Sequence, residues 1–229
     1  MIDISYDKRF AKLRKMIFEM VNITENQILT LLNGIGSSDN TLLDRIKKNE
    51  MTIDKYDVKI DKISRKILAL NNPIACDLRF VLTAYTVSSK LELISDNCQV
   101  IAENLKELDF QKPIFFNELN ANEYFSLIES QITLSFESFI QSDSDKAIKA
   151  ILQFESLNTK YMELSKLIKK EIIERGNQLS EVMTFYEVCN YLLQISKISK
   201  SLAEEVYFMV ESKIIKHVNL NIDVDIKNR

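Results

Sequence analysis

Carboxylate side chains recur along one stretch of the sequence at the spacing of a helix face. The members of this set are Glu50, Asp54, Asp57 and Asp61. Steps of four, three and four residues stack side chains above one another on an α-helix. Because like charges at this spacing repel each other, such a face favours either full contact with water or a bound cation.

A second acidic pair, Glu92 and Asp96, stands one helical turn apart later in the sequence. The same stripe begins with residues that face a core: Leu78, Leu82 and Tyr85. Burying two carboxylates on such a line costs free energy unless a cation compensates their charge. Oxygen ligands suit hard cations such as Mg²⁺, Ca²⁺ and Mn²⁺, and also iron.

The alternative interpretation is that the first acidic stripe is an ordinary solvated helix face. Lys55, Lys59 and Lys62 lie within the same stretch, and mixed charges are typical of a helix surface in water. The spacing by itself leaves both interpretations open.

The usual catalytic templates do not fit this sequence. His217 is the only histidine, so a pair of histidines for a zinc or di-iron site is absent from the chain. Gly34 and Gly36 lack the Gly-Lys-Ser/Thr that completes a phosphate-binding loop, and they fit a helix end instead. We therefore expect a protein that binds and regulates, and not an enzyme.

The elements that carry these residues are expected to be long helices. The chain of 229 residues has only 3 glycines and 2 prolines, which leaves little room for an all-β fold with frequent turns. Helical spacing of apolar residues and turn signals predict helices at about 7–32, 39–71, 73–108, 118–140, a fifth ending near residue 175, and 179–216. Ser142 to Asp145 is expected to form a turn and a helix cap.

The two halves of the sequence have the same layout of helices. Ile53-Asp54 aligns with Leu157-Asn158, and Ile101-Ala102-Glu103 aligns with Leu202-Ala203-Glu204. Because this repeat spans about a hundred residues, a duplicated three-helix unit explains it better than a solenoid does. The predicted fold is all-α: two tandem three-helix bundles at 1–108 and 109–217, followed by a tail at 218–229.

Charge and composition narrow the class of partners. The net charge is −3, so the basic surface that binds nucleic acid is not expected. No apolar run approaches the ~20 residues of a membrane-spanning helix, and the N-terminus lacks the pattern of a signal peptide. The three cysteines, Cys76, Cys98 and Cys189, are interpreted as reduced core residues of a cytoplasmic protein.

The residues from Leu68 to Arg79 resemble the PhoU family. That family has a Pro-x-Ala-x-Asp-Leu-Arg sequence at a helix break, which here is Pro73-Ile74-Ala75-Cys76-Asp77-Leu78-Arg79. Some thirteen residues further on the family has Glu-Arg-Ile-Gly-Asp, which here is Glu92-Leu93-Ile94-Ser95-Asp96. Upstream, Ile53-Asp54 and Ile60-Asp61 stand where the family has Ile/Val-Asp pairs, and Glu50 with Asp54 repeats the Glu-x-x-x-Asp spacing.

The resemblance implies one metal site in the N-terminal half, for a divalent or ferric cation. Its ligands would be Glu50, Asp54, Glu92 and Asp96. The C-terminal half departs from the family pattern, because Leu193 and Lys197 stand where the second Glu and Asp are expected. A second metal site is therefore not expected. Structural roles are expected for Asp77, in the first turn of its helix, and for Arg79, paired with an acid of the preceding helix.

The resemblance also implies a function and partners. PhoU proteins are cytoplasmic accessory proteins of phosphate uptake that couple a phosphate ABC transporter to a membrane sensor histidine kinase. The expected partners are that kinase and the transporter ATPase at the inner face of the membrane, and the expected assembly is a homodimer. Two alternatives stay open: a metal-dependent enzyme that uses the helix-borne carboxylates, and a helical scaffold for another membrane partner.

Overall fold

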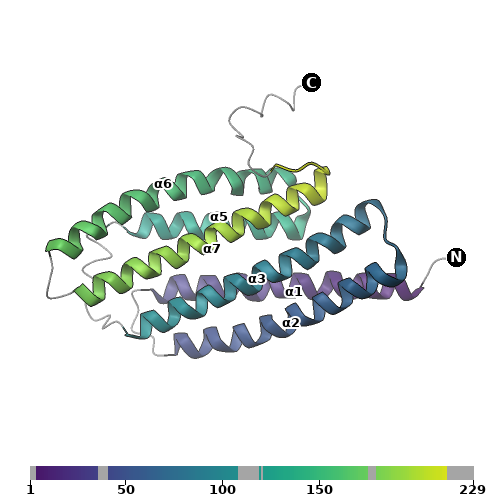
Figure 1. Cartoon of the computed structure of the whole chain (residues 1–229), viewed down its shortest axis with the longest axis horizontal. Helices are drawn as coiled ribbons and strands as arrows, with labels where there is room; N and C mark the ends of the chain where they lie inside the picture. The colour runs from purple at the N-terminus through teal and green to yellow at the C-terminus, as the bar shows by residue number, and fades with distance from the viewer. Residues whose placement is uncertain (1–3, 36–40, 108–118, 120, 175–178, 216–229) are drawn as a thin grey trace, which may run out of the picture.

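The computed structural model describes residues 4–35, 41–107, 119, 121–174 and 179–215, and within them the fold is all-α. The helices are α1 (Ile4–Gly34), α2 (Leu42–Asn71), α3 (Ala75–Glu107), α5 (Ala121–Gln141), α6 (Ser144–Glu174) and α7 (Leu179–Glu211). Figure 1 shows them as long, roughly aligned rods. None of these helices has an apolar stretch long enough to cross a membrane.

Each helix buries the apolar stripe that its sequence predicts. On α2 the buried residues are Leu42, Ile46, Ile53, Ile60, Ser64 and Ile67. Their steps of three, four and seven residues define one face of a helix, so α2 packs inward along that line and leaves the rest of its surface to water.

The helices form two three-helix bundles that share one core. Helices α1, α2 and α3 pack together, as do α5, α6 and α7, and the bundles meet where α3 lies along α7 and α1 along α5. At this junction Phe139 of α5 lies edge-on to Phe18 and stacks on Phe80, with ring centroids 5.8 and 6.3 Å apart. Lys90 of α3 donates a 2.9 Å hydrogen bond to Ser201 of α7. The expected all-α fold of paired three-helix units is therefore confirmed.

The predicted helix ends differ from the structure at two places. Pro73 was expected to open the third helix, but α3 begins at Ala75, because Asn72 and Ala75 take left-handed φ values of 43° and 47° at the break. The last helix was expected to reach residue 216, but α7 ends at Glu211. There Ser212, with φ of 60°, donates its N–H to the Phe208 carbonyl.

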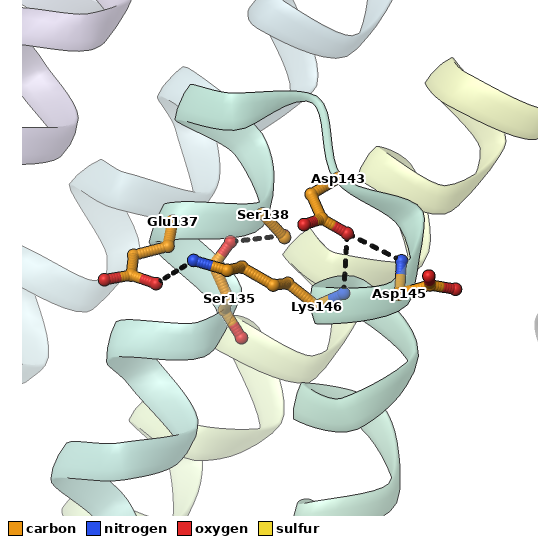
Figure 2. Close-up of polar contacts among 6 residues, drawn as sticks. All are labelled: Ser135, Glu137, Ser138, Asp143, Asp145 and Lys146. Atoms are coloured by element: carbon orange, nitrogen blue, oxygen red, sulfur yellow. Dashed lines mark hydrogen bonds and ion pairs between the residues drawn. The ribbon is translucent and has the colours of Figure 1, made fainter.

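The turn between α5 and α6 confirms the cap predicted at residues 142–145 (Figure 2). The Oδ1 of Asp143 accepts hydrogen bonds from the backbone N–H groups of Asp145 and Lys146, at 2.9 and 3.0 Å. These groups would otherwise lack partners at the start of α6. Lys146 also forms an ion pair with Glu137 of α5 across the turn.

Gly34 ends α1 directly against the side chain of Leu42, at the start of α2. A Cβ at this residue would lie 2.5 Å from a terminal carbon of Leu42, so the glycine lets the start of α2 pack directly onto the end of α1. The predicted start of the second helix at residue 39, the histidine at 217 and the tail at 218–229 lie outside the described residues.

The cysteine prediction is right for two of the three residues. Cys98 and Cys189 are buried, and burial raises the pKa of both thiols. Cys76 is exposed and was wrongly expected in the core. Its position in the first turn after the α2–α3 break leaves it on the outside of the helix.

Candidate metal centre

Three of the predicted ligands meet where α2 and α3 run side by side. Glu50 and Asp54 come from α2, and Asp96 comes from α3. Each offers a carboxylate oxygen, and these oxygens all lie within 4.8 Å of one another. In the described part of the chain this is the only group of three or more acids, histidines or cysteines with that geometry.

Glu92, the fourth predicted ligand, lies outside this closest group but within its electrostatic field. Partial burial raises the pKa of the Glu92 carboxyl, and the negative charges of Asp96, Asp57, Asp54 and Glu50 raise it further. The two acids of α3 therefore face the acidic stripe of α2, as one turn of separation on a shared helix face requires.

The other members of the cluster respond in the same direction. Burial raises the pKa of Glu50, and so do the charge of Asp54 and a hydrogen bond with it, while Lys47 acts in the opposite sense. Burial and then Asp54 raise the pKa of Asp96. Each of these shifts means that the ionised form is disfavoured in the folded protein. A cation between the carboxylates would reverse that penalty.

Asp57 adds an unpaired oxygen beside the cluster. Its Oδ1 is buried and has no hydrogen-bond partner among the described residues. A buried carboxylate oxygen without a partner carries a desolvation cost, which a bound cation or water would remove. An all-oxygen donor set with this unsatisfied neighbour fits a hard cation, and it does not fit a zinc site of cysteine and histidine. Asp57 belongs to the acidic stripe, but its spacing alone did not mark it as part of the centre.

Asp61, the last member of the stripe, is engaged elsewhere. Its Oδ1 accepts a 2.7 Å hydrogen bond from the Nε of Arg65, whose other nitrogen donates to the Tyr85 hydroxyl at 3.1 Å. Lys55, Lys59 and Lys62 are all exposed. The acidic stripe thus has two parts. Glu50, Asp54 and Asp57 face the acids of α3, and Asp61 is neutralised by Arg65.

Asp77 and Arg79 connect the N-terminal end of α3 to other helices. Asp77 accepts a 2.7 Å hydrogen bond from the Tyr6 hydroxyl of α1, and burial together with this contact raises the pKa of Tyr6. The Nε of Arg79 donates to the backbone carbonyl of Met209 in α7 at 3.0 Å. The expected pairing of Arg79 with an acid of the preceding helix is therefore wrong. The last turn of α7 needs donors for its free carbonyls, and Arg79 supplies one.

The corresponding face of the C-terminal half has no acidic cluster in the described residues. The counterparts of Glu50 and Asp54 on α6 are Phe154, which is buried, and Asn158. On α7, Leu193 is buried and Lys197 is exposed. The Nζ of Lys200 lies 5.1 Å from the centre of the Phe154 ring and 3.5 Å from a carboxylate oxygen of Glu155.

Comparison with known proteins gives the same family over both halves. A family model described as "PhoU domain" matches residues 17–105 and again residues 121–206. A phosphate-specific transport system accessory protein PhoU homolog of Aquifex aeolicus is 24% identical over 213 residues, which cover 93% of this chain and 96% of the relative. The protein named PhoU in Escherichia coli is 18% identical and covers 93% of this chain and 88% of its own length.

Two solved structures have the same fold. The crystal structure of PhoU from Pseudomonas aeruginosa aligns with a TM-score of 0.85 at 20% identity, over 91% of this chain and 100% of that one. The phosphate transport system regulatory protein PhoU from Streptococcus pneumoniae aligns with a TM-score of 0.80 at 19% identity, over 92% and 99%. The architecture is therefore shared over nearly the whole length.

Proposed function

The chain belongs to the PhoU family, and from that premise we propose that it is an accessory protein that regulates phosphate uptake. The observation that carries this proposal is the family match over both halves, together with similarity to named phosphate-transport accessory proteins over more than nine-tenths of the chain. Two long helical bundles with extended faces suit a protein that acts by docking to others.

The partners belong to the same proposal. The chain contacts the ATPase of a phosphate ABC transporter and a membrane sensor histidine kinase, from the cytoplasmic side of the membrane, and it restrains both when phosphate is plentiful. A homodimer is the expected assembly. The relatives support the association with a transporter, because their names assign them to a phosphate-specific transport system.

A divalent or ferric cation bound between α2 and α3 is the second part of the proposal. Glu50, Asp54 and Asp96 would hold it directly, with Glu92 beside them. The clustered oxygens, the raised pKa values and the unpaired oxygen of Asp57 support this assignment. The cation would neutralise the acidic face and fix the spacing of α2 against α3.

No catalytic role is proposed for this centre. The matched relatives are named as accessory proteins of a phosphate-specific transport system, and their names assign them no reaction. If a metal-dependent enzyme were the right answer, turnover would accompany metal binding and would be lost in Glu92→Gln.

The regulatory role is tested by deleting the gene and measuring phosphate-uptake genes in high phosphate. We expect their expression to rise, because the restraint on the kinase is lost. Unchanged expression would contradict the proposal. A pull-down of the full chain from cells at high phosphate, followed by identification of the membrane proteins that copurify, tests the partners separately. Recovery of the transporter ATPase and the kinase is the expected result.

A further inference from the structure

Exposed lysines line the outer surface of α1 and α2, the antiparallel helix pair at one edge of the molecule (Figure 1). Steps of three, four and seven residues place each set of lysines on one face of its helix. We call this surface the lysine face. Its members are Lys8, Lys12 and Lys15 on α1, and Lys48, Lys55, Lys59, Lys62 and Lys66 on α2, all of them exposed.

A chain of contacts joins the two sets of lysines into one surface. The Nζ of Lys59 lies 5.8 Å from the centre of the Tyr56 ring. The Tyr56 hydroxyl donates a 2.9 Å hydrogen bond to Glu19 of α1, and the Nζ of Lys15 lies 3.8 Å from the other oxygen of that carboxylate. Lys15 and Lys59 therefore lie at the same α1–α2 contact, and the other lysines extend from them along both helices.

The lysine face carries charge of almost one sign. Glu19 and Asp44 are the acids of α1 and α2 that share it, because the acidic stripe that includes Asp54 is turned about 100° around α2 toward α3. Lysines three and four residues apart repel each other, so this face lacks the mixed charges of an ordinary solvated helix. The net charge of −3 hides this positive surface because the acids lie elsewhere.

The fold itself does not require these lysines. In the C-terminal half, Thr159 and Glu163 stand on α6 at the positions that match Lys55 and Lys59. That bundle packs in the same way without a basic outer face. The lysine face is therefore a property of one half alone, as a binding surface would be.

Two apolar side chains are exposed among the lysines. Met51 is 57% exposed and Val58 is 66% exposed. They alternate with Lys55 and Lys62 in steps of four, three and four residues, so the four side chains form one line along α2. This combination is typical of a helix that lies on a membrane, where the ammonium groups meet the headgroups and the apolar groups enter the boundary below them.

The chemistry of the face is complementary to an anionic lipid surface. Lysine is a hydrated point charge that suits a diffuse negative field, whereas fixed pairing with one carboxylate or phosphate favours the planar fork of arginine. The lysines from 48 to 66 span about 27 Å of helix, so they face an extended surface and not a single ligand. Met51 and Val58 decide against nucleic acid, because a phosphate backbone offers them no apolar contact.

We propose that the lysine face binds the anionic headgroups of a membrane surface, with α1 and α2 lying along the bilayer. Met51 and Val58 then reach the apolar boundary, and the acidic cluster on the α3 side of α2 stays clear of the headgroups. This contact needs neither the transporter nor the kinase. Purified protein therefore tests it independently of the proposed function.

Cosedimentation of the full chain with vesicles tests the charge of the face. We expect binding to vesicles of phosphatidylcholine mixed with phosphatidylglycerol, weakened by added salt, and little binding to phosphatidylcholine alone. Each lysine near an anionic surface contributes about fivefold to the affinity, so combining Lys55→Gln, Lys62→Gln and Lys66→Gln should weaken binding by at least about thirtyfold. The matched control combines three exposed lysines of α6 and should bind nearly as the parent chain does: Lys149→Gln, Lys166→Gln and Lys170→Gln.

A fluorophore sensitive to polarity tests the orientation. In a Cys76→Ser background, it is attached at Val58→Cys or, as the control, at Met162→Cys, the exposed matching position on α6. The remaining cysteines are buried. We expect anionic vesicles to shift the emission to shorter wavelength at residue 58 and to leave it unchanged at residue 162.

Four results would overturn the proposal. They are no binding to anionic vesicles, equal binding to neutral vesicles, an equal loss of binding in the two triple variants, and equal emission shifts at residues 58 and 162. Binding of the lysine face to RNA or to an acidic protein, without binding to vesicles, would assign the face to that macromolecule instead.

Discussion

The two halves of the molecule share a core and differ at one face. Core positions stay apolar in both, as in Ile53 and Leu157 or Ile60 and Leu164, all of them buried. The second and third helix of each half face each other along one surface. On this surface the second half has other residues where the first half has acids. The replaced pairs are Glu50 by Phe154, Asp54 by Asn158, Glu92 by Leu193 and Asp96 by Lys197.

This difference separates what the fold needs from what a site needs. A three-helix bundle requires apolar volume at its inner positions, and any change there leaves a cavity or a clash. A cluster of carboxylates adds only repulsion and desolvation unless a cation is bound. The half that keeps its acids therefore keeps a destabilising feature that the other half lacks, which supports the proposal that this face binds a cation.

The largest loss of stability is expected from substitutions in the shared core. Ile60→Ala and Leu164→Ala each remove a fully or almost fully buried side chain at equivalent positions, so each should lower the free energy of unfolding by about 2–5 kcal/mol. Chemical denaturation of the two variants measures this. A large loss in one half and none in the other would show that the two bundles do not form one cooperative core.

The sharpest contrast between the halves should be metal binding. Asp54→Asn removes the negative charge of one of the three clustered carboxylates and should weaken cation affinity by at least about tenfold. The reciprocal change, Asn158→Asp, should create no site, because Phe154, Leu193 and Lys197 stand at the positions that match the other three acids. Metal analysis of protein purified without chelator, followed by titration calorimetry, measures both. Equal metal content in Asp54→Asn and in the parent chain would contradict the assignment of Asp54 as a metal ligand.

The pH dependence of stability should also differ between the halves. In the metal-free protein the pKa values of Glu50, Glu92 and Asp96 are raised on folding, mainly by burial. The folded chain then binds more protons than the unfolded chain, whose carboxyls titrate near pH 4. Stability should therefore fall as pH rises from about 4 through the raised folded values, and the melting temperature in chelator should be higher at the acidic end.

Removing the titrating groups isolates that effect. Glu50→Gln with Glu92→Gln should flatten the fall in melting temperature and stabilise the metal-free protein at neutral pH. Glu129→Gln, at an exposed position on α5, is the matched control and should leave the profile unchanged. A double variant with the same pH profile as the parent would show that repulsion in the cluster is negligible.

Much of this structure follows from patterns that act within one helix. The period of apolar residues predicts the six helices, and the spacing of Glu50, Asp54, Glu92 and Asp96 predicts which acids share a face. The partner of Arg79 does not follow, because it depends on how α3 lies along α7, 130 residues later in the chain.

Helix ends were predicted less well than helix faces. Pro73 is a good first residue for a helix, but the left-handed residues on either side of the break delay α3 to Ala75. The exposed Cys76 follows from that shift, because the beginning of a helix has fewer buried positions. Such details depend on backbone geometry at single residues, which composition and period do not encode.

The smallest predicted change in stability concerns the ammonium group of Lys200 in the C-terminal half. Lys200 places its ammonium over the ring of Phe154, the residue that replaces Glu50, and near Glu155. A partly buried contact of this kind contributes about 0.5–1 kcal/mol. In a double-mutant cycle, Lys200→Met and Phe154→Leu should therefore be coupled by that amount, measured by urea denaturation.

Gln99 stands at the matching position of the first half, so Gln99→Met with Glu50→Gln should show no such coupling. If the Lys200 cycle were also additive, the Lys200 ammonium would not stabilise this face through Phe154.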